Sequence, residues 1–355
     1  MLLLLLGAAI HLTTFHPPPQ QAERVHCPAD APLLEPGQTF KVMTWNVQYM
    51  AGKDYVFWYD VADGSGPDVR PAPAAITRTF AEVARVIGEE RPDLVLLQEV
   101  NDGAKRTDHE DQLARLLKLL PTDYSCHTSA FYWKAAFLPE PHIMGSVGMK
   151  LSTVSKYRIE SARRHQLPMV PKDPFTRQFY FRRAVLEARL PVRGGSEFVA
   201  LNTHLDAFAR GTDTMERQVA KVNELLHRLT RATLPWVIGG DFNVLPPGPQ
   251  YEGLPESERV WYDPESDLTL LFDRYQAVPS LANLSGPSTT EWFTHFPNNP
   301  DASGPALTLD YLFISDGMRI VTSRVRRDDT LAISDHLPVV AVVTLPSPDS
   351  AASAN

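Results

Sequence analysis

The chain has 355 residues, of which 43% are hydrophobic and 21% charged, a composition typical of globular proteins and unlike that of disordered or fibrous ones. Its formal net charge is -8 at pH 7, which gives no support to a broad basic surface for nucleic acid but allows a local basic groove.

Two cysteines, Cys27 and Cys126, are too few for a cysteine-rich scaffold or a thiolate zinc cluster. They either form one disulfide in an oxidising compartment or remain free thiols.

The chain begins with an apolar run over residues 1–10 that resembles the hydrophobic part of a signal peptide or a short membrane anchor. The positive charges that usually precede such a run are missing, and the run is too short to span a bilayer, which takes about 20 apolar residues. We therefore expect an exported protein that is periplasmic, secreted or membrane-anchored. Membrane association would occur through this N-terminus.

Residues 11–38 are rich in proline and have no periodicity, which predicts a linking or wrapping lead outside the core. No second linker is visible further along. The prediction is a lead over residues 1–37, one folded domain over residues 38–346 and a flexible tail over residues 347–355. We expect this domain to act as a monomer.

The first half of the domain contains strands and helices in alternation. Residues 40–46 alternate in polarity like a strand, and residues 76–87 repeat their apolar side chains at helical spacing until Pro92. Residues 94–97 are a continuous apolar run, as expected of a strand buried on both faces. A second helix is predicted over residues 111–120.

The second half is richer in strands. An amphipathic helix is predicted over residues 212–230. Strands are predicted at residues 146–151, 179–190, 198–202, 236–238, 309–314, 320–325 and 339–343.

Five of the apolar runs end in a short polar cluster, and a sixth strand carries a lone carboxylate, Asp310. Burying a carboxylate or an imidazole without a partner costs several kcal/mol, so six such places indicate strand ends that converge around a cation. The five clusters are Trp45-Asn46, Gln98-Glu99, Asn202-Thr203-His204, Gly240-Asp241-Phe242-Asn243 and Ser334-Asp335-His336.

The residue types in these clusters predict which cation is bound. Oxygen donors suit Mg²⁺, Mn²⁺ or Ca²⁺, whereas Zn²⁺ favours imidazole and thiolate. Two histidines, His204 and His336, accompany the oxygen donors and can donate to a phosphate oxygen or carry a proton. The set therefore predicts a divalent-metal-dependent hydrolase of phosphate esters. Its oxygen donors are Asn46, Glu99, Asp241, Asn243 and Asp335.

Taken in order, these motifs resemble the endonuclease/exonuclease/phosphatase family, which includes deoxyribonuclease I and neutral sphingomyelinases. They run from Thr44 to His336, so the resemblance covers nearly the whole predicted domain. It implies an α/β fold: a four-layer α/β/β/α sandwich of two packed mixed β-sheets, with the site at one end.

The resemblance also implies a role for each matching residue. Glu99 would be the principal metal ligand, assisted by Asn46 and Asp335. Asp241 would orient or deprotonate the attacking water, while Asn243 would hold a phosphate oxygen or that water.

The remaining roles concern the phosphate and its leaving group. His336 would contact the scissile phosphate, and Asp310 would fix its tautomer and raise its pKa. His204 would steady the phosphate or protonate the leaving group. Each of these residues taken alone also has a purely structural explanation. We predict no functional role for His109, His127, His142 and His295.

The substrate is left open by the sequence. The aromatic run over residues 131–137 lies in a long connection and either packs down or contacts a ligand, as do residues 57–59 and 291–296. Three arginines either reach phosphate oxygens or lie on a solvated face: Arg177, Arg182 and Arg183.

Three functions are therefore considered. The first is a phosphodiesterase or nuclease acting on nucleic acid or a nucleotide-like diester. The second is a lipid or inositol phosphoesterase, in which a phospholipid head group is the substrate. The third, a non-catalytic binding module of the same fold, is disfavoured because no expected ligand is replaced.

Overall fold

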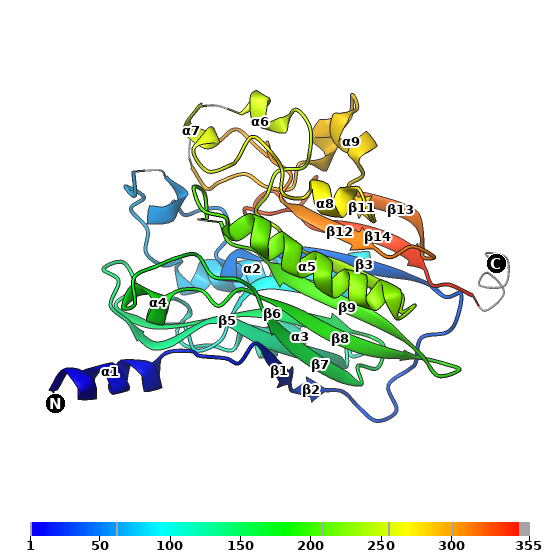
Figure 1. The fold of residues 1–355 in the computed structure, drawn as a ribbon, viewed down its shortest axis with the longest axis horizontal. Coiled ribbons are helices and arrows are strands. Elements are labelled where there is room, and N and C mark those ends of the chain that lie inside the picture. Colours follow the sequence, from blue (N-terminus) through cyan, green and yellow to red (C-terminus); the bar gives the residue numbers. More distant parts are fainter. Residues whose placement is uncertain (1, 62, 208, 255, 300–301, 348–355) are drawn as a thin grey trace.

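The computed structural model describes residues 2–61, 63–207, 209–254, 256–299 and 302–347. Within these residues, two seven-stranded mixed β-sheets pack face to face, and helices cover their outer faces (Figure 1). The predicted four-layer sandwich is confirmed.

The first sheet is built mainly from the N-terminal half of the chain and is completed by the last two strands. Its strands are β2 (Val25–His26), β3 (Thr39–Asn46), β4 (Leu94–Asn101), β5 (Cys126–Leu138), β6 (Gly145–Ser155), β13 (Arg319–Val325) and β14 (Val339–Thr344). Their order is β13-β14-β3-β4-β6-β5-β2.

The second sheet holds most of the remaining strands. They are β1 (Gln20–Glu23), β7 (Ser161–Gln166), β8 (Ala184–Val192), β9 (Ser196–His204), β10 (Trp236–Asp241), β11 (Gln276–Val278) and β12 (Asp310–Ile314). Their order is β1-β7-β8-β9-β10-β12-β11.

The main core lies between the sheets, where apolar side chains of alternate strand positions meet. The rings of Phe40 in β3 and Phe198 in β9 pack edge to face, with centroids 5.1 Å apart. A buried polar contact crosses the same interface, because Gln98 Nε2 donates to Asn202 Oδ1 at 2.7 Å. Buried amides need such partners, so this contact favours one alignment of the sheets.

Three helices cover the outer faces of the sheets. α2 (Pro73–Glu90) and α3 (Gln112–Leu117) pack on the first sheet, and α5 (Thr214–Arg231) packs on the second. The other helices are α1 (Leu2–Thr13), α4 (Thr176–Phe179), α6 (Gln250–Gly253), α7 (Glu256–Arg259), α8 (Thr269–Phe272) and α9 (Leu281–Ser285), with 3₁₀ turns η1 (Gln48–Met50), η2 (Trp58–Asp60), η3 (Lys105–Thr107) and η4 (Thr289–Trp292).

Two expectations about the middle of the chain are wrong. The aromatic run at residues 131–137 belongs to the long strand β5 and not to a loop, since aromatic residues suit a pleated, half-buried surface. The predicted strand over residues 179–190 begins only at Ala184, because Tyr180 and Phe181 leave the sheet and line a cleft.

The N-terminal lead contributes more than a linker. β1 pairs with β7 at the edge of the second sheet, and β2 pairs with β5 at the edge of the first. Leu34 is fully buried in the core between the sheets. The sequence does not predict these strands, because they are short and polar. The predicted flexible tail lies, from residue 348 on, outside the described residues.

The apolar N-terminal run forms α1, which projects from the body of the molecule (Figure 1). None of the helices in the described part of the chain has the length and apolar content needed to cross a bilayer.

The two cysteines are joined: Cys27, at the end of β2, is bonded to Cys126, at the start of β5, across 99 residues of sequence. The disulfide fastens the lead to the edge of the first sheet. A cross-link that closes so long a loop restricts the unfolded chain and thereby stabilises the folded one.

We predict that the variant Cys27→Ala/Cys126→Ala has a free energy of unfolding lower by about 2–5 kcal/mol in urea titrations. Dithiothreitol should lower the stability of the unaltered protein and leave that of the variant unchanged. Equal stability of the reduced and oxidised protein would contradict a stabilising role for this bond.

Candidate active site

Strand pairing gathers the polar clusters at one edge of the sandwich. β3 and β4 run parallel, which places Asn46 opposite Gln98, and β9 and β10 run parallel, which places His204 opposite Asp241. β12 is antiparallel to β10, so that Asp310, at its start, lies opposite Asp241. Parallel strands end at the same edge, and antiparallel ones begin there, so clusters distant in sequence become neighbours.

A β-bulge directs Glu99. Gln98 and Glu99 in β4 together oppose a single residue of β6. Glu99 has a φ of 59°, a left-handed conformation that costs a non-glycine residue on the order of 1 kcal/mol or more. As a result Gln98 points between the sheets, and the next residue lines the cleft. The strained backbone conformation of Glu99 therefore directs its carboxylate into the cleft.

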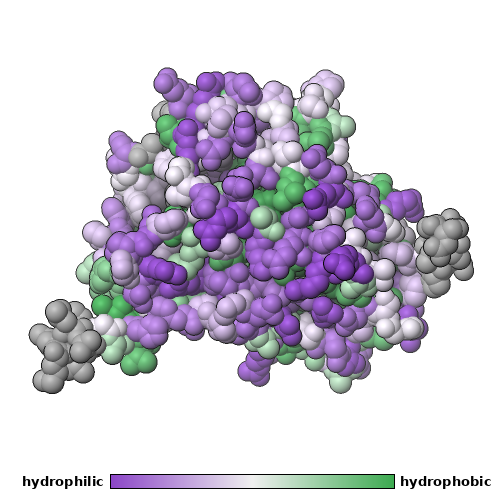
Figure 2. Space-filling view, in the orientation of Figure 1, coloured by the Kyte–Doolittle hydropathy of each residue, from purple (hydrophilic) through white to green (hydrophobic). Residues whose placement is uncertain are grey.

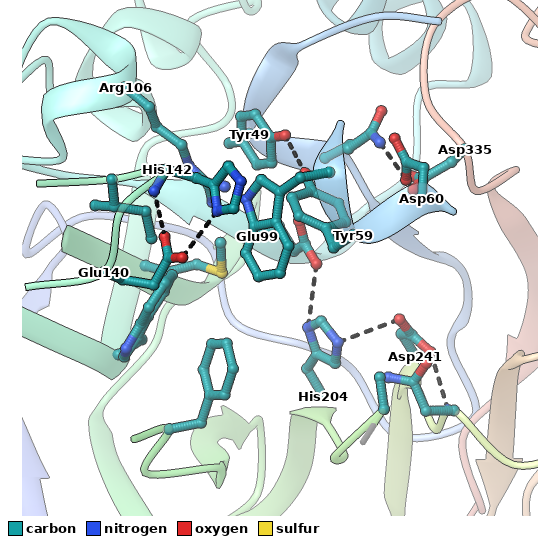
Figure 3. A pocket seen from close by; sticks show the side chains of 18 of the residues that line it. Tyr49, Tyr59, Asp60, Glu99, Arg106, Glu140, His142, His204, Asp241 and Asp335 are labelled. Atoms are coloured by element: carbon teal, nitrogen blue, oxygen red, sulfur yellow. Dashed lines mark hydrogen bonds and ion pairs between the residues drawn. The ribbon is translucent and has the colours of Figure 1, made fainter. Parts of the chain in front are cut away.

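The clusters open into a cleft of about 560 Å³, within the size range of pockets for small molecules and cofactors. Figure 3 shows His204 between Glu99 and Asp241: its Nδ1 lies 4.0 Å from Glu99 Oε1, and its Nε2 lies 3.3 Å from Asp241 Oδ2. Six of the eight predicted site residues line the cleft: Glu99, His204, Asp241, Asn243, Asp335 and His336.

The other two predicted site residues, Asn46 and Asp310, lie just behind the cleft. Asp310 is fully buried, and its Oδ2 lies 2.7 Å from His336 Nδ1, while His336 Nε2 lies 3.5 Å from Asp241 Oδ2. Burial alone would disfavour an imidazolium, but Asp310 and Asp241 hold the pKa of His336 above its usual value. The structure thus brings His336 and Asp310 together as a histidine and its orienting carboxylate.

The pKa of His204 is shifted in the opposite direction. Its pKa lies well below the usual value because of burial and the positive charges of Arg183 and His336. The Tyr132 hydroxyl lies 3.3 Å from its Nδ1. The cleft therefore contains one histidine that favours the charged form and one that favours the neutral form, as in sites that divide acid and base roles.

Two asparagines hold Asp241. Asn46 Nδ2 donates to Asp241 Oδ2 at 3.1 Å, and the backbone N–H of Asn243 donates to Asp241 Oδ1 at 3.0 Å. The Asn46 oxygen accepts from the backbone N–H of Gln48 at 3.1 Å. In this arrangement Asn46 orients a carboxylate, and its predicted role as a metal ligand stays a prediction.

The donor set fits a hard divalent cation. The pKa of Glu99 is raised first by burial and then by the charge of Asp335, so the two carboxylates interact electrostatically across the cleft. Asp310 Oδ1 is buried without a hydrogen-bond partner. A cation at this end of the cleft would offset the cost of burying these charges.

Ligand atoms also gather here in two groups that share His336. The atoms of each group lie within 4.8 Å of one another: His295, Asp335 and His336 form one group, and Asp241, Asp310 and His336 form the other.

Sequence reasoning missed three residues of the site. His295 was expected to have no role, but it lines the cleft, and its ring centroid lies 4.5 Å from that of His336. A backbone bridge between these two residues brings it there. Gln48 Nε2 donates to Asp335 Oδ2 at 2.9 Å, and Tyr132 contacts His204. The aromatic runs over residues 131–137 and 291–296 gave a signal for Tyr132 and His295, and no pattern in the sequence marked Gln48.

The cleft continues into an aromatic wall. The rings of Trp133 and Phe181 lie 4.5 Å apart, and Trp58 stacks on His142 at 4.8 Å. Of the three candidate arginines, only Arg183 lines this cleft, where its guanidinium lies 4.5 Å from the Phe181 ring. The site thus combines a charged end with an apolar side.

Solved structures share this architecture. One is an endonuclease/exonuclease/phosphatase from Beutenbergia cavernae, with 23% identity, a TM-score of 0.57, and coverage of 87% of this chain and 72% of that one. Another is the human Nocturnin catalytic domain with bound sulfate, with 17% identity, a TM-score of 0.52, and coverage of 90% and 96%. At these identities the likeness establishes the fold.

A third similar structure, ANGEL2, described as a 2',3'-cyclic phosphatase, has 17% identity, a TM-score of 0.50, and coverage of 92% of this chain and 98% of that one. A search among curated proteins found no match. The sequence pattern of the Endonuclease/Exonuclease/phosphatase family matches residues 43–336, the span that contains all the clusters described above. The chain belongs to the endonuclease/exonuclease/phosphatase family.

Proposed function

We propose that this protein is a divalent-metal-dependent phosphodiesterase. Members of its family are typically phosphoester hydrolases, and one observation carries the finer assignment. Three carboxylates, of Glu99, Asp241 and Asp335, and two histidines converge at one cleft, and a fourth carboxylate, that of Asp310, is buried behind the histidine with the raised pKa. Such a set can hold a cation, align a water molecule and move a proton, which phosphate ester hydrolysis requires.

In this proposal Glu99 and Asp335 hold the metal, and the side-chain oxygen of Asn46 belongs to the same set of oxygen donors. Mg²⁺ is the expected ion, and Mn²⁺ or Ca²⁺ would suit the same oxygen donors. When bound, the ion would neutralise phosphate charge and favour attack at phosphorus.

The protein's own groups supply the remaining chemistry. Asp241 accepts the proton of the attacking water, and burial, opposed by the charge of His336, raises its pKa toward that task. His336, charged beside Asp310, donates to a phosphate oxygen as negative charge develops. Burial and the charges of Arg183 and His336 lower the pKa of His204, and an adjacent phosphate would raise it and allow His204 to donate a proton to the leaving group.

The aromatic wall supports a substrate with a flat or apolar group next to the scissile phosphate. A nucleotide-like diester meets this description, since bases stack on aromatic rings. A lipid phosphoesterase is the second candidate. It is favoured by the exposed apolar side chains of Phe137 and Met144, which belong to the β5–β6 hairpin whose residues Leu138 and Ile143 line the cleft.

Export is part of the proposal. A disulfide between Cys27 and Cys126 is typical of an oxidising compartment outside the cytosol, and the apolar start of the chain is consistent with an exported protein that keeps this segment as a membrane anchor.

The metal requirement can be tested first. EDTA should abolish hydrolysis of bis-p-nitrophenyl phosphate, and added Mg²⁺ should restore it. Glu99→Gln should lower turnover by about 100-fold or more and require more Mg²⁺ for half-maximal rate, because a neutral amide is a weaker ligand. Glu224→Gln, an exposed carboxylate on α5, is the matched control. Full activity in EDTA would contradict the mechanism.

The role of the histidine–carboxylate pair gives a second prediction. His336→Ala and Asp310→Asn should each lower kcat by a factor of about 100 or more with the circular dichroism spectrum retained, since proton transfer and charge stabilisation typically contribute that much. His227→Ala, on the exposed face of α5, should keep normal turnover. Near-normal kcat for His336→Ala would show that the role assignment is wrong.

Substrate preference gives a third prediction. We expect bis-p-nitrophenyl phosphate to be cleaved faster than p-nitrophenyl phosphate, and short single-stranded oligonucleotides faster than supercoiled plasmid, because the cleft suits small ligands. Sphingomyelin is assayed in parallel. Cleavage of this lipid with every nucleotide substrate untouched would replace the first candidate by the second.

A further inference from the structure

A second pocket, of about 360 Å³, lies between the N-terminal lead and the α4 segment. Its lining is basic, and no carboxylate belongs to it. The cationic and imidazole side chains that line it are His11, His16, Lys172, Arg177 and Arg182.

Backbone carbonyls hold this cluster together. Arg182 is largely buried, its Nε donates to the Phe15 carbonyl at 3.2 Å, and one Nη donates to the Arg177 carbonyl at 2.9 Å. The same Nη lies 3.4 Å from His16 Nδ1, and the His16 ring stacks on that of His11 at 4.0 Å. These contacts fix the geometry of the pocket without neutralising its charge.

The positive groups have no carboxylate among the residues that line the pocket, although Lys172 acts electrostatically on the buried carboxylate of Asp206. Among the described residues, no carboxylate forms an ion pair within 4.0 Å with Lys172, Arg177 or Arg182, although ion pairs are common elsewhere in the chain. The pKa of His16 is lowered by burial and by His11 and Arg182, which reflects the crowding of like charge. An anion in this pocket would relieve that repulsion.

Apolar surface adjoins the pocket. Leu12, next to His11, is 83% exposed, and Phe175, on the α4 side, is 56% exposed. The helix α1, whose sequence is almost entirely apolar, leads directly into the pocket. Figure 2 shows hydrophobic side chains gathered where this helix leaves the body. A free anion would need none of this apolar surface, whereas a lipid surface would bury it.

The pocket also lies beside the catalytic cleft. Thr176 and Phe179 of α4 line the cleft, and Arg177 and Gln178, between them in the sequence, line the basic pocket. Arg182 and Arg183 likewise point to opposite sides of the same segment. A surface held at the pocket would therefore lie beside the α4 segment that borders the cleft.

We propose that this basic pocket binds the phosphate-bearing head group of an anionic lipid and holds the protein on a membrane surface beside its cleft. The pocket is separate from the catalytic groups, so the proposal does not depend on which ester is cleaved. The pocket has a cationic centre flanked by the apolar side chains of Leu12 and Phe175. This arrangement matches a membrane surface, where anionic head groups lie next to apolar acyl chains.

The test measures cosedimentation of the full chain with vesicles of phosphatidylcholine alone and of phosphatidylcholine mixed with phosphatidic acid. We expect association with the anionic vesicles only. The variant Lys172→Gln/Arg177→Gln should bind them roughly 25-fold more weakly, since each cation near an anionic surface contributes about fivefold. Lys118→Gln/Arg231→Gln removes two exposed charges outside the pocket, on α3 and α5, and should bind normally.

Hydrolysis of bis-p-nitrophenyl phosphate, measured without vesicles, should be equal in both variants and the unaltered protein, which separates surface binding from catalysis. Inorganic phosphate is titrated calorimetrically into the unaltered protein and into Lys172→Gln/Arg177→Gln, so that binding at the cleft cancels between them. Equal binding to both vesicle types, or equal vesicle binding by both variants, would overturn the proposal. So would phosphate binding at the pocket with no vesicle association, which would assign it to a soluble anion.

Discussion

A hydrogen bond between two buried amides fixes the relation of the two sheets on which the site depends. Gln98 Nε2 donates to Asn202 Oδ1 at 2.7 Å, and Asn202 Nδ2 in turn donates to the carbonyls of Leu97 and Ser152. Other alignments would leave these groups unpaired in an apolar core, at a cost of about 1–3 kcal/mol each. The residues that follow, Glu99 and His204, are thereby held on either side of one cleft.

Electrostatic pairing then differentiates groups that look alike in the sequence. His336 has Asp310 on one side and Asp241 on the other, which favours its charged form, whereas burial and the charge of Arg183 lower the pKa of His204. Two carboxylates near a common point, Glu99 and Asp335, gain from a cation that neither could hold alone. The proposed chemistry rests on these contrasts between similar side chains.

The same segment that closes one side of the cleft also carries the basic pocket. Thr176 and Phe179 of α4 line the cleft and the two residues between them line the pocket, so the catalytic end and the proposed lipid-binding surface are built from one stretch of chain. The lead contributes the opposite wall of the pocket, and the bond between Cys27 and Cys126 fastens it to the first sheet. The proposed catalysis and the proposed placement at a surface would thus be coupled by proximity and not by a shared side chain.

The order of the strand-end motifs in the sequence predicted the family and, through that resemblance, the sandwich. Periodicity and strand-end clusters are local properties of the chain, so they predicted most of the core elements and the polar residues that end the apolar strands. It did not predict β1, β2 or Gln48, which have no local pattern and gain their positions only through contacts with distant strands, nor that His295, within the run over residues 291–296, meets His336. Tertiary structure alone decided that Arg182 and Arg183 face different pockets and that Tyr132 meets His204. Such contacts depend on the packing of segments far apart in sequence, and that packing is set by the fold as a whole.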